Sequence, residues 1–192
     1  MPRTREQFKE MKDERKSSIL NAALILFSTS EKVSIDSICE KAKCSHGIIY
    51  HYFPNVNRIH DSILLMPTYK ELRTKLFEEN EGSSYDKIEH ILSICLSVSI
   101  KDKEITAFLN ILIKDREKES LHSVLSKFIK DGQAAGSIIG GDPVQIVDSI
   151  FLLLKGLYLS LLLEKHPDIK VPSLETVMQL IRKPTNFSRQ IL

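Results

Sequence analysis

Four residues near position 50 are spaced so that they share one side of a helix, and all four suit contact with a polar groove. They are His46, Gly47, Tyr50 and His51. Residues at positions i, i+1, i+4 and i+5 lie next to one another at the helical period. Imidazole and phenol groups hydrogen-bond to phosphate oxygens and base edges, and a glycine lets the backbone approach a groove wall closely. With Ile48 at its margin, where it suits a thymine methyl group, this face is predicted to bind DNA.

Two short helices joined by a tight turn are predicted to present this face. Ser34 is expected to cap the first helix, and Asp36 places a carboxylate in its first turn, where free backbone N–H groups favour negative charge. The apolar residues of this helix recur at three- and four-residue intervals: Ile35, Ile38, Cys39 and Ala42. Ser45 is expected to cap the second helix, which ends at Phe53 before Pro54. This is the spacing of a DNA-binding helix-turn-helix.

A helix over residues 13–28 is predicted to support the motif from behind. Its apolar side chains repeat at the helical period: Ile19, Ala22, Ala23, Leu26 and Phe27. In the second helix of the motif, Ile49 and Phe53 are expected to face the same small core, with Ile48 and Tyr52 beside them. Three short helices around one core make a compact DNA-binding head.

The same stretch resembles the N-terminal signature of the TetR family of transcription regulators. The resemblance covers residues 15–59 and includes the run 42–53 together with Arg15, Ile19, Leu20, Ala22, Ala23, Phe27, Ser34 and Ile38. Its most specific part is the string CSHGIIYHYF, which is similar to the family's recognition-helix pattern VSxGxLYxYF. The resemblance implies an all-α chain. It places a helix-turn-helix DNA-binding domain over residues 12–60 and a helical effector-binding and dimerisation domain over residues 61–192.

The resemblance also implies which residues contact DNA. Residues 50–52 and their basic neighbours are expected to bind phosphates and set the register, whereas residues 46–48 are expected to select bases. The predicted set is Ser34, Lys43, Ser45, His46, Gly47, Ile48, Tyr50, His51, Tyr52 and Arg58.

Three departures from the family pattern concern charge and turn geometry. After the first helix, where the family usually has a glycine, this chain has the residues 30–32, Ser-Glu-Lys. Lys43 occupies a turn position that is usually glycine. Val56 stands where the family often has a phosphate-binding lysine at the start of its fourth helix. Lys43 and Arg58 are both candidates to replace that phosphate contact.

The charge of the chain fits a protein that binds DNA through a local surface. The net charge is +2 over 192 residues, with 42% hydrophobic and 27% charged residues, as in an ordinary soluble domain. Residues 1–60 contain 10 basic and 7 acidic residues. A basic lead-in consists of Arg3, Arg5, Lys9, Lys12, Arg15 and Lys16. It suits contact with phosphates, although acidic residues between positions 6 and 14 are expected to weaken its field; a solvated leader without a partner is the alternative.

Two cysteines and two histidines form the pattern C-x4-C-x-H-x4-H: Cys39, Cys44, His46 and His51. Structural zinc sites usually place about a dozen residues between the two ligand pairs, whereas a single residue separates these. We therefore predict no metal and no cofactor, with the cysteines packed and the histidines at the surface or on DNA. Three cysteines in a sequence without a signal-peptide pattern favour a reduced, cytoplasmic setting.

Beyond position 56 the periodicity predicts the helices of the second domain. A long helix over residues 57–80, interrupted or kinked at Pro67, is expected to act as a lever between the domains or merely to join two rigid parts. Further helices are predicted over residues 85–100, 104–114, 121–135, 142–165 and 173–183.

The segment 142–165 is nearly all apolar and opens with Asp142 and Pro143, which together signal a helix start. Asp148 and Lys155 divide it into uncharged runs shorter than the roughly 18–20 residues of a membrane span, so no membrane is expected. A helix that is apolar around most of its surface can bury one side on its own domain and the other on a second copy. We predict a homodimer through the helices at 142–165 and 173–183, where the TetR resemblance also places dimerisation.

These features predict a cytoplasmic, homodimeric transcriptional regulator that binds a palindromic double-stranded DNA operator, as a repressor rather than an activator. The resemblance implies a small-molecule effector in the second domain. The candidate pocket residues are Met66, His90, Cys95, Phe108, His122, Phe151 and Tyr158. Core packing is the alternative for each of them.

An enzyme is not expected from this sequence. It contains no Gly-rich phosphate loop, no H-E-x-x-H and no nucleophile elbow, so no catalytic residue is predicted. An all-helical protein-interaction module without DNA binding is the alternative function.

Overall fold

Helices make up almost all of the described structure, which confirms the all-α prediction. The computed structural model describes residues 4–78, 81–98, 102–115, 120–164 and 168–183. Its first helices are α1 (Arg5–Thr29), α2 (Ile35–Ala42), α3 (His46–Tyr52) and α4 (Val56–Leu64). They are followed by the 3-10 turn η1 (Pro67–Tyr69), α5 (Lys70–Phe77), α6 (Ser84–Leu96), α7 (Lys103–Lys114), α8 (Leu121–Ala134), α9 (Pro143–Leu163) and α10 (Leu174–Gln179).

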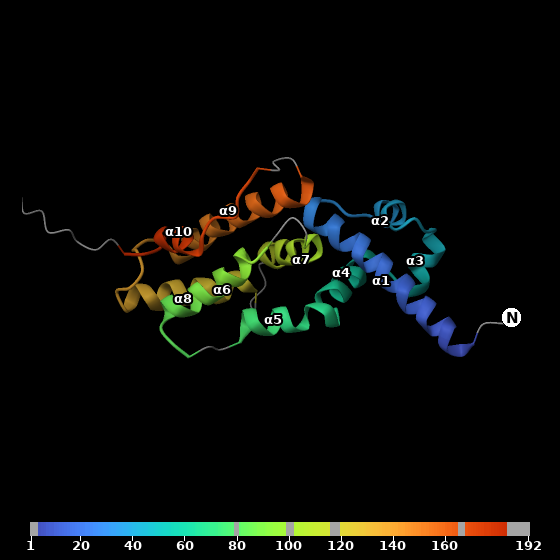
Figure 1. Cartoon of the computed structure of the whole chain (residues 1–192), viewed down its shortest axis with the longest axis horizontal. Coiled ribbons are helices and arrows are strands. Elements are labelled where there is room, and N and C mark those ends of the chain that lie inside the picture. The colour runs from blue at the N-terminus through green and yellow to red at the C-terminus, as the bar shows by residue number, and fades with distance from the viewer. Residues whose placement is uncertain (1–3, 79–80, 99–101, 116–119, 165–167, 184–192) are drawn as a thin grey trace, which may run out of the picture.

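The helices gather at two ends of an elongated molecule (Figure 1). Helices α1 to α4 lie together at one end, here called the head (residues 4–65), and the later helices form the body (residues 66–183). Helix α1 packs on α2 and α4 within the head and also on α7 of the body, whereas α8 and α9 pack on each other. Helix α1 is therefore the element that the two ends share.

Helix α1 begins earlier than the periodicity of residues 13–28 predicted. It starts at Arg5, after Thr4, whose hydroxyl accepts a hydrogen bond from the backbone N–H of Gln7 at 3.3 Å. The Gln7 side chain accepts in return from the N–H of Thr4 at 3.0 Å, which completes a capping box. The basic lead-in is thus helical from Arg5 onwards, and Arg3 lies outside the described residues.

The predicted helix over residues 57–80 is interrupted at Pro67 and not kinked there, because two helices and a turn occupy the described part of this stretch. Helix α4 ends at Leu64, and Pro67 starts η1 before α5 begins. Proline has no N–H to continue a helical ladder, so it suits the first position of a new turn and not a kink within one helix. Arg73 on α5 donates to the carbonyl of Leu64 and so ties the two helices together across the break.

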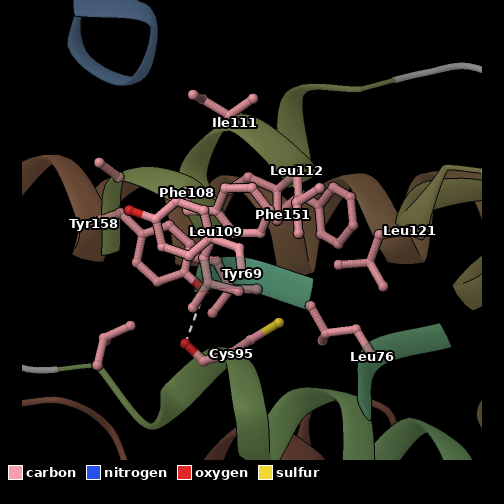
Figure 2. Close-up of a cluster of buried hydrophobic side chains, with 14 of the residues drawn as sticks. Tyr69, Leu76, Cys95, Phe108, Leu109, Ile111, Leu112, Leu121, Phe151 and Tyr158 are labelled. Carbon is pink, nitrogen blue, oxygen red and sulfur yellow. Dashed lines mark hydrogen bonds between the residues drawn. The ribbon is translucent and has the colours of Figure 1, made fainter. Parts of the chain in front are cut away.

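The core of the body is built around two aromatic residues that are fully buried, Phe108 on α7 and Tyr158 on α9. Tyr69 of η1 stacks on Phe108 with ring centroids 4.1 Å apart. The Tyr158 hydroxyl donates to the backbone carbonyl of Cys95 on α6 at 2.8 Å, so the phenol is satisfied within the core (Figure 2). These contacts join four elements of the body.

Helix α9 buries one side of its 21 residues and leaves the other uncovered. Asp142 caps its start by accepting from the N–H of Val144 at 2.9 Å, as predicted. The buried side consists of Val147, Ile150, Phe151, Leu154, Leu157, Tyr158 and Leu161. By length and hydropathy alone α9 matches a membrane span. Core helices of globular proteins have the same properties, and the buried side of α9 packs on α7 and α8.

The last predicted helix, over residues 173–183, is shorter than expected and faces inward. Helix α10 ends at Gln179, and its Val177 and Met178 are 1% and 2% exposed because α10 packs on α6. After α10 the carbonyl of Ile181 accepts from the N–H of Ile139 at 3.0 Å, which fastens this segment to the loop before α9. Val177, Met178 and Ile181 are therefore used inside the subunit, whereas Leu180 stays exposed, and the predicted role of this segment in a dimer remains a prediction. Residue 165, the end of the other predicted interface helix, lies outside the described residues.

Candidate nucleic-acid interface

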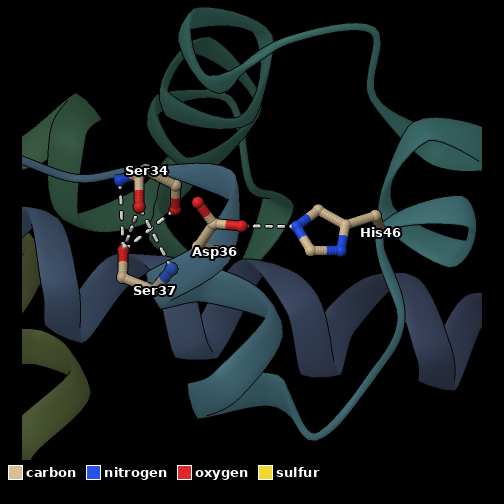
Figure 3. A network of polar contacts seen from close by, with 4 residues as sticks. All are labelled: Ser34, Asp36, Ser37 and His46. Atoms are coloured by element: carbon tan, nitrogen blue, oxygen red, sulfur yellow. Dashed lines mark hydrogen bonds and ion pairs between the residues drawn. The ribbon is translucent and has the colours of Figure 1, made fainter.

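Helix α2 starts at Ser34, as predicted. The Ser34 hydroxyl accepts from the N–H of Ser37 at 3.1 Å, and the Ser37 hydroxyl accepts from the N–H of Ser34 at 3.1 Å (Figure 3). This capping box satisfies two backbone N–H groups that have no partner within the helix. The Ser34 side chain, which we predicted to contact DNA, is therefore already engaged in holding the start of α2.

The turn between α2 and α3 contains the residue that replaces the expected glycine. Lys43 has φ 49° and ψ 55°, the left-handed conformation that suits glycine best. A side chain in this conformation costs roughly 1–2 kcal/mol. The N–H of Cys44 donates to the carbonyl of Cys39 at 3.0 Å, and a guanidinium nitrogen of Arg15 donates to the carbonyl of Lys43 at 3.4 Å. These two hydrogen bonds stabilise the turn despite the strained backbone of Lys43.

Helix α3 has the two faces that its sequence predicted. Ile49 is fully buried, and Phe53 just beyond the helix is 3% exposed. The outer face is solvent-exposed and consists of His46, Gly47, Tyr50 and His51. Ser45 occupies the capping position, but its hydroxyl makes no capping hydrogen bond, which corrects that detail of the prediction. The outer face nevertheless projects from the head as a polar surface.

His46 does not stand alone on this surface, because it contacts a carboxylate from the other helix of the motif. Its Nε2 atom lies 2.5 Å from Oδ1 of Asp36 on α2 (Figure 3). Both side chains are largely exposed. The contact fixes one ring nitrogen and directs the other side of the imidazole outward. In the sequence, Asp36 indicates only a favourable charge at a helix start, and its spacing from His46 does not predict this pair.

Two exposed cations of the head are candidates for the phosphate contact that Val56 cannot make, Arg58 near the start of α4 and Lys43 in the turn after α2. Arg58 is exposed, and its guanidinium lies 3.5 Å from the carboxylate of Asp61. Its N–H donates to the side chain of Asn55, which caps the helix, at 2.9 Å. Lys43 is also exposed, and within the described residues its ammonium group makes no ion pair. Both cations therefore remain available at the surface of the head.

A groove of about 900 Å³ lies between α3 and the N-terminal part of α1. One wall consists of Phe8, Met11, Lys12 and Arg15 from α1. The other wall consists of Gly47, Ile48, His51 and Tyr52 from α3. The groove therefore begins at one edge of the predicted DNA-binding face.

The other end of α1 is attached to the body by polar contacts with α7. The side-chain amide of Asn110, which is fully buried, donates to the carbonyl of Ser28 at 2.9 Å. The Lys114 ammonium donates to the same carbonyl at 2.7 Å and to that of Phe27 at 2.9 Å. Cations suit the C-terminal carbonyls of a helix. Desolvation lowers the pKa of Lys114, and the nearby Lys155 cation lowers it further.

The residues predicted to line an effector pocket do not surround one open cavity. Cys95, Phe108 and Tyr158 are fully buried and packed together (Figure 2). Burial raises the pKa of Cys95 to about 12. The remaining four candidates are Met66, His90, His122 and Phe151. Among them, Phe151 lines a surface cleft of about 400 Å³ beside α7.

Three of those four candidates have partners of their own. The His122 Nε2 lies 3.2 Å from the Asp148 carboxylate, and its ring meets Phe151 edge-on with centroids 5.7 Å apart. The His90 Nε2 lies 3.1 Å from the carbonyl of Lys75. These contacts fit the alternative of core packing, which the sequence analysis left open.

A residue that the sequence analysis missed has an unpaired polar group in this core. Tyr69 is 2% exposed, and its hydroxyl has no hydrogen-bond partner among the described residues. Burial raises the pKa of Tyr69 to about 12, and the Glu104 carboxylate adds to the shift. No periodic pattern marked Tyr69, because it lies in the short turn after Pro67.

The cysteines and histidines of the C-x4-C-x-H-x4-H pattern are separated by the fold. Cys39 is buried in the core of the head, whereas His46 and His51 are on the outer face of α3. Among the described residues, no three His, Cys, Asp or Glu side chains converge in a way that could hold a metal ion.

The sequence matches no protein-family profile and no curated protein. Solved structures do match. A protein from Rhodococcus sp. described as a TetR-family transcriptional regulator is 19% identical, with a TM-score of 0.54 over 86% of this chain and 94% of that one. NalD from Pseudomonas aeruginosa, the secondary repressor of the MexAB-OprM multidrug efflux pump, is 18% identical, with a TM-score of 0.54 over 90% of this chain and 98% of that one.

A third similar structure is a transcriptional regulator from Saccharomonospora viridis in complex with choline. It is 16% identical, with a TM-score of 0.52 over 90% of this chain and all of that one (100%). These structures show that the present chain has the fold of TetR-family regulators, with a helix-turn-helix head and a helical body.

Proposed function

We propose that this chain is a sequence-specific DNA-binding transcriptional regulator that acts as a homodimer. The observation that carries the proposal is the exposed polar face of α3, held outward by a helix-turn-helix in a TetR-like fold. In such motifs the second helix enters the major groove, and a twofold dimer reads two half-sites. The neighbours with this fold are transcriptional regulators and not enzymes, in keeping with the sequence.

The proposed contacts are of two kinds: some position the protein on the DNA, and others select the bases. Residues 46–48 face the bases, with His46 oriented by its contact with Asp36. Residues 50–52 and the cations Lys43 and Arg58 bind phosphates. Each phosphate neutralised by a cation adds about 0.9 to the slope of log K against log salt, so binding weakens steeply as salt rises.

The proposed dimer forms through the uncovered side of α9. At the helical period this side consists of Gln145, Ser149, Leu152, Gly156, Leu159 and Leu163. The exposed Lys155 lies at its edge, about 60° around the helix from Leu152. A Cβ added to Gly156 would meet nothing within 4 Å, so the helix surface is open to close approach there. Helix α8, which packs on α9, is its neighbour in a four-helix arrangement of two subunits, in place of the inward-facing α10.

The proposed regulation is repression that a small molecule relieves in the cytoplasm. The similar regulator from Saccharomonospora viridis binds choline. In the present chain the core around Tyr158 and Phe108 is closed. A ligand there must separate packed helices, and it acts only if it binds the open body more tightly than the closed one. The unpaired hydroxyl of Tyr69 gives such a ligand a polar partner.

DNA binding is tested by titrating the full chain against the DNA upstream of its own gene at several salt concentrations. We expect a saturable complex with a strong salt slope. Tyr50→Ala should weaken binding to every sequence, because it removes a phosphate contact, and His46→Ala should reduce sequence preference. Leu180→Ala on the body is the control, because Leu180 is 55% exposed and Tyr50 is 56% exposed. Unchanged affinity in Tyr50→Ala together with unchanged preference in His46→Ala would overturn the assignment of the recognition helix.

The dimer is tested with two matched leucines. Leu152 on α9 is 70% exposed and Leu65 after α4 is 69% exposed, so neither replacement disturbs a core. We expect sedimentation to show that Leu152→Glu is monomeric and that Leu65→Glu remains dimeric. If both variants remain dimers, the proposed interface is wrong.

A further inference from the structure

The groove between α1 and α3 has large apolar side chains in its α1 wall, yet it is open to solvent. Phe8 is 59% exposed and Met11 is 44% exposed, although both are large apolar side chains. They stand opposite Gly47 and Ile48 of α3 across a volume of about 900 Å³. Exposed apolar side chains grouped beside a predicted binding face indicate a surface that is covered by a partner.

The charges of α1 are sorted around the helix in a way that favours an anionic partner. At about 100° per residue, the cations of its first three turns lie within about 100° of Phe8. They are Arg5, Lys9, Lys12, Arg15 and Lys16. The acids lie about 120° or more from Phe8. They are Glu6, Glu10, Asp13 and Glu14. The acids therefore face away from the groove, and the cations face it.

We propose that this groove holds the sugar–phosphate strand of the DNA that borders the bases read by α3. The inference rests on the proposed function and extends it to a second DNA contact on α1. Lys12 and the free donors of Arg15 bind phosphates, while Phe8 and Met11 pack against the faces of deoxyribose rings. A nucleic-acid strand has anionic phosphates and apolar sugar faces. The groove has cations that suit the phosphates and apolar side chains that suit the sugars.

The position of the groove is consistent with this occupant. Its α3 wall includes Ile48 and His51, one at the margin of the reading face and one on it. DNA seated on α3 must therefore continue past the mouth of the groove. Arg15 also donates to the carbonyl of Lys43 and so links the groove to the turn of the helix-turn-helix.

Hydroxyl-radical footprinting tests the sugar contacts, because the radical attacks exposed deoxyribose. The chain and its double variant Phe8→Ala/Met11→Ala are compared on the same upstream DNA. We expect the variant to lose protection at the sugars that flank the sequence read by α3 and to keep protection beneath α3. Leu65→Ala is the control, since Leu65 is 69% exposed and does not line the groove. An unchanged footprint in the double variant would overturn the inference.

Salt titration tests the phosphate contacts with two exposed lysines. Lys12→Met and Lys70→Met each remove one exposed cation, the first from the groove and the second from α5. We expect only Lys12→Met to lower the salt slope, by about 1.8 for a dimer that loses one phosphate contact in each subunit. Equal slopes for the two variants would contradict the proposal.

The outcomes separate this inference from the proposed function. If the unaltered chain protects no DNA, the proposed function fails. If it gives a footprint that none of these variants changes, only the groove assignment fails. If Phe8→Ala/Met11→Ala changes the sedimentation of the free chain and not the footprint, the groove contacts another protein surface and the inference is wrong.

Discussion

The polar contacts near the two ends of α1 differ in how far they are exposed to solvent. At the C-terminal end, the buried amide of Asn110 and the ammonium of Lys114 bind the last carbonyls of the helix. Towards the N-terminal end, the contacts that order the reading motif are on the surface: Arg15 to the carbonyl of Lys43, and His46 to Asp36. One end is fixed to the body, whereas the other remains in contact with solvent.

This difference indicates that one set of contacts stabilises the structure and the other set is available for binding DNA. A buried hydrogen bond is costly to break because its partner is left without water, whereas exposed polar groups exchange readily between protein and solvent. The contacts at α7 therefore set the orientation of the head on the body. The contacts at α3 can be exchanged for contacts with phosphates and bases at little cost, as a reading surface requires.

The largest effect is expected from Asn110→Ala. The change removes a buried hydrogen bond to Ser28 and leaves a cavity, which together lower the free energy of unfolding by about 2–3 kcal/mol. The loss of the unpaired Oδ1 atom of Asn110 offsets part of this. Urea unfolding followed by circular dichroism gives the value. Asn57→Ala, at an exposed position of α4, is the control, and an equal cost for both would remove the contrast between buried and exposed contacts.

A smaller effect is expected from Lys114→Met, because Lys114 is exposed apart from its ammonium contacts. Loss of the hydrogen bonds to Phe27 and Ser28 should lower the free energy of unfolding by about 1 kcal/mol. Lys70→Met, which removes an exposed cation without such contacts, should change it by less than about 0.5 kcal/mol. Salt titration of DNA binding should give the same slope for both variants, since neither lysine is placed on DNA.

Asp36→Asn is expected to cost less than about 1 kcal/mol in the free energy of unfolding, because its contact with His46 is exposed. DNA binding should change more clearly. Removing a carboxylate beside the reading face should strengthen non-specific binding, and releasing His46 should reduce sequence preference. A double-mutant cycle with His46→Ala measures the coupling. Additive effects on sequence preference would show that Asp36 does not position His46.

Periodic patterns predicted helices well where a single apolar face of the helix packs into a single core. The spacing of Ile38, Cys39 and Ala42 specified α2, and Ile49 and Phe53 specified the inner face of α3. Start signals were equally informative, since Ser34 and Asp142 both cap the helices assigned to them. These features are local, and local geometry determines them.

Contacts between distant segments could not be read from such patterns. His46 and Asp36 meet across a turn whose path depends on the left-handed Lys43, and Asn110 reaches Ser28 from 82 positions away. Periodicity also shows that a stripe is apolar without showing what covers it. The stripe of α10 was therefore assigned to a second copy although α6 covers it, and Tyr158 was assigned to a pocket although it lies in a closed core.

The smallest effect is expected from Lys43→Gly, and its sign is opposite to the others. Glycine relieves the roughly 1–2 kcal/mol of strain that a side chain has in the left-handed conformation, while its freedom in the unfolded chain costs about 0.4–1 kcal/mol. The free energy of unfolding should therefore rise by about 0.5 kcal/mol. Lys41→Gly, two residues earlier in right-handed α2, should lower it by about 1 kcal/mol. If Lys43→Gly destabilises the chain as much as Lys41→Gly does, then the Lys43 side chain stabilises the turn. The exposed contacts of the head would then contribute more to stability than the comparison with the α7 junction implies.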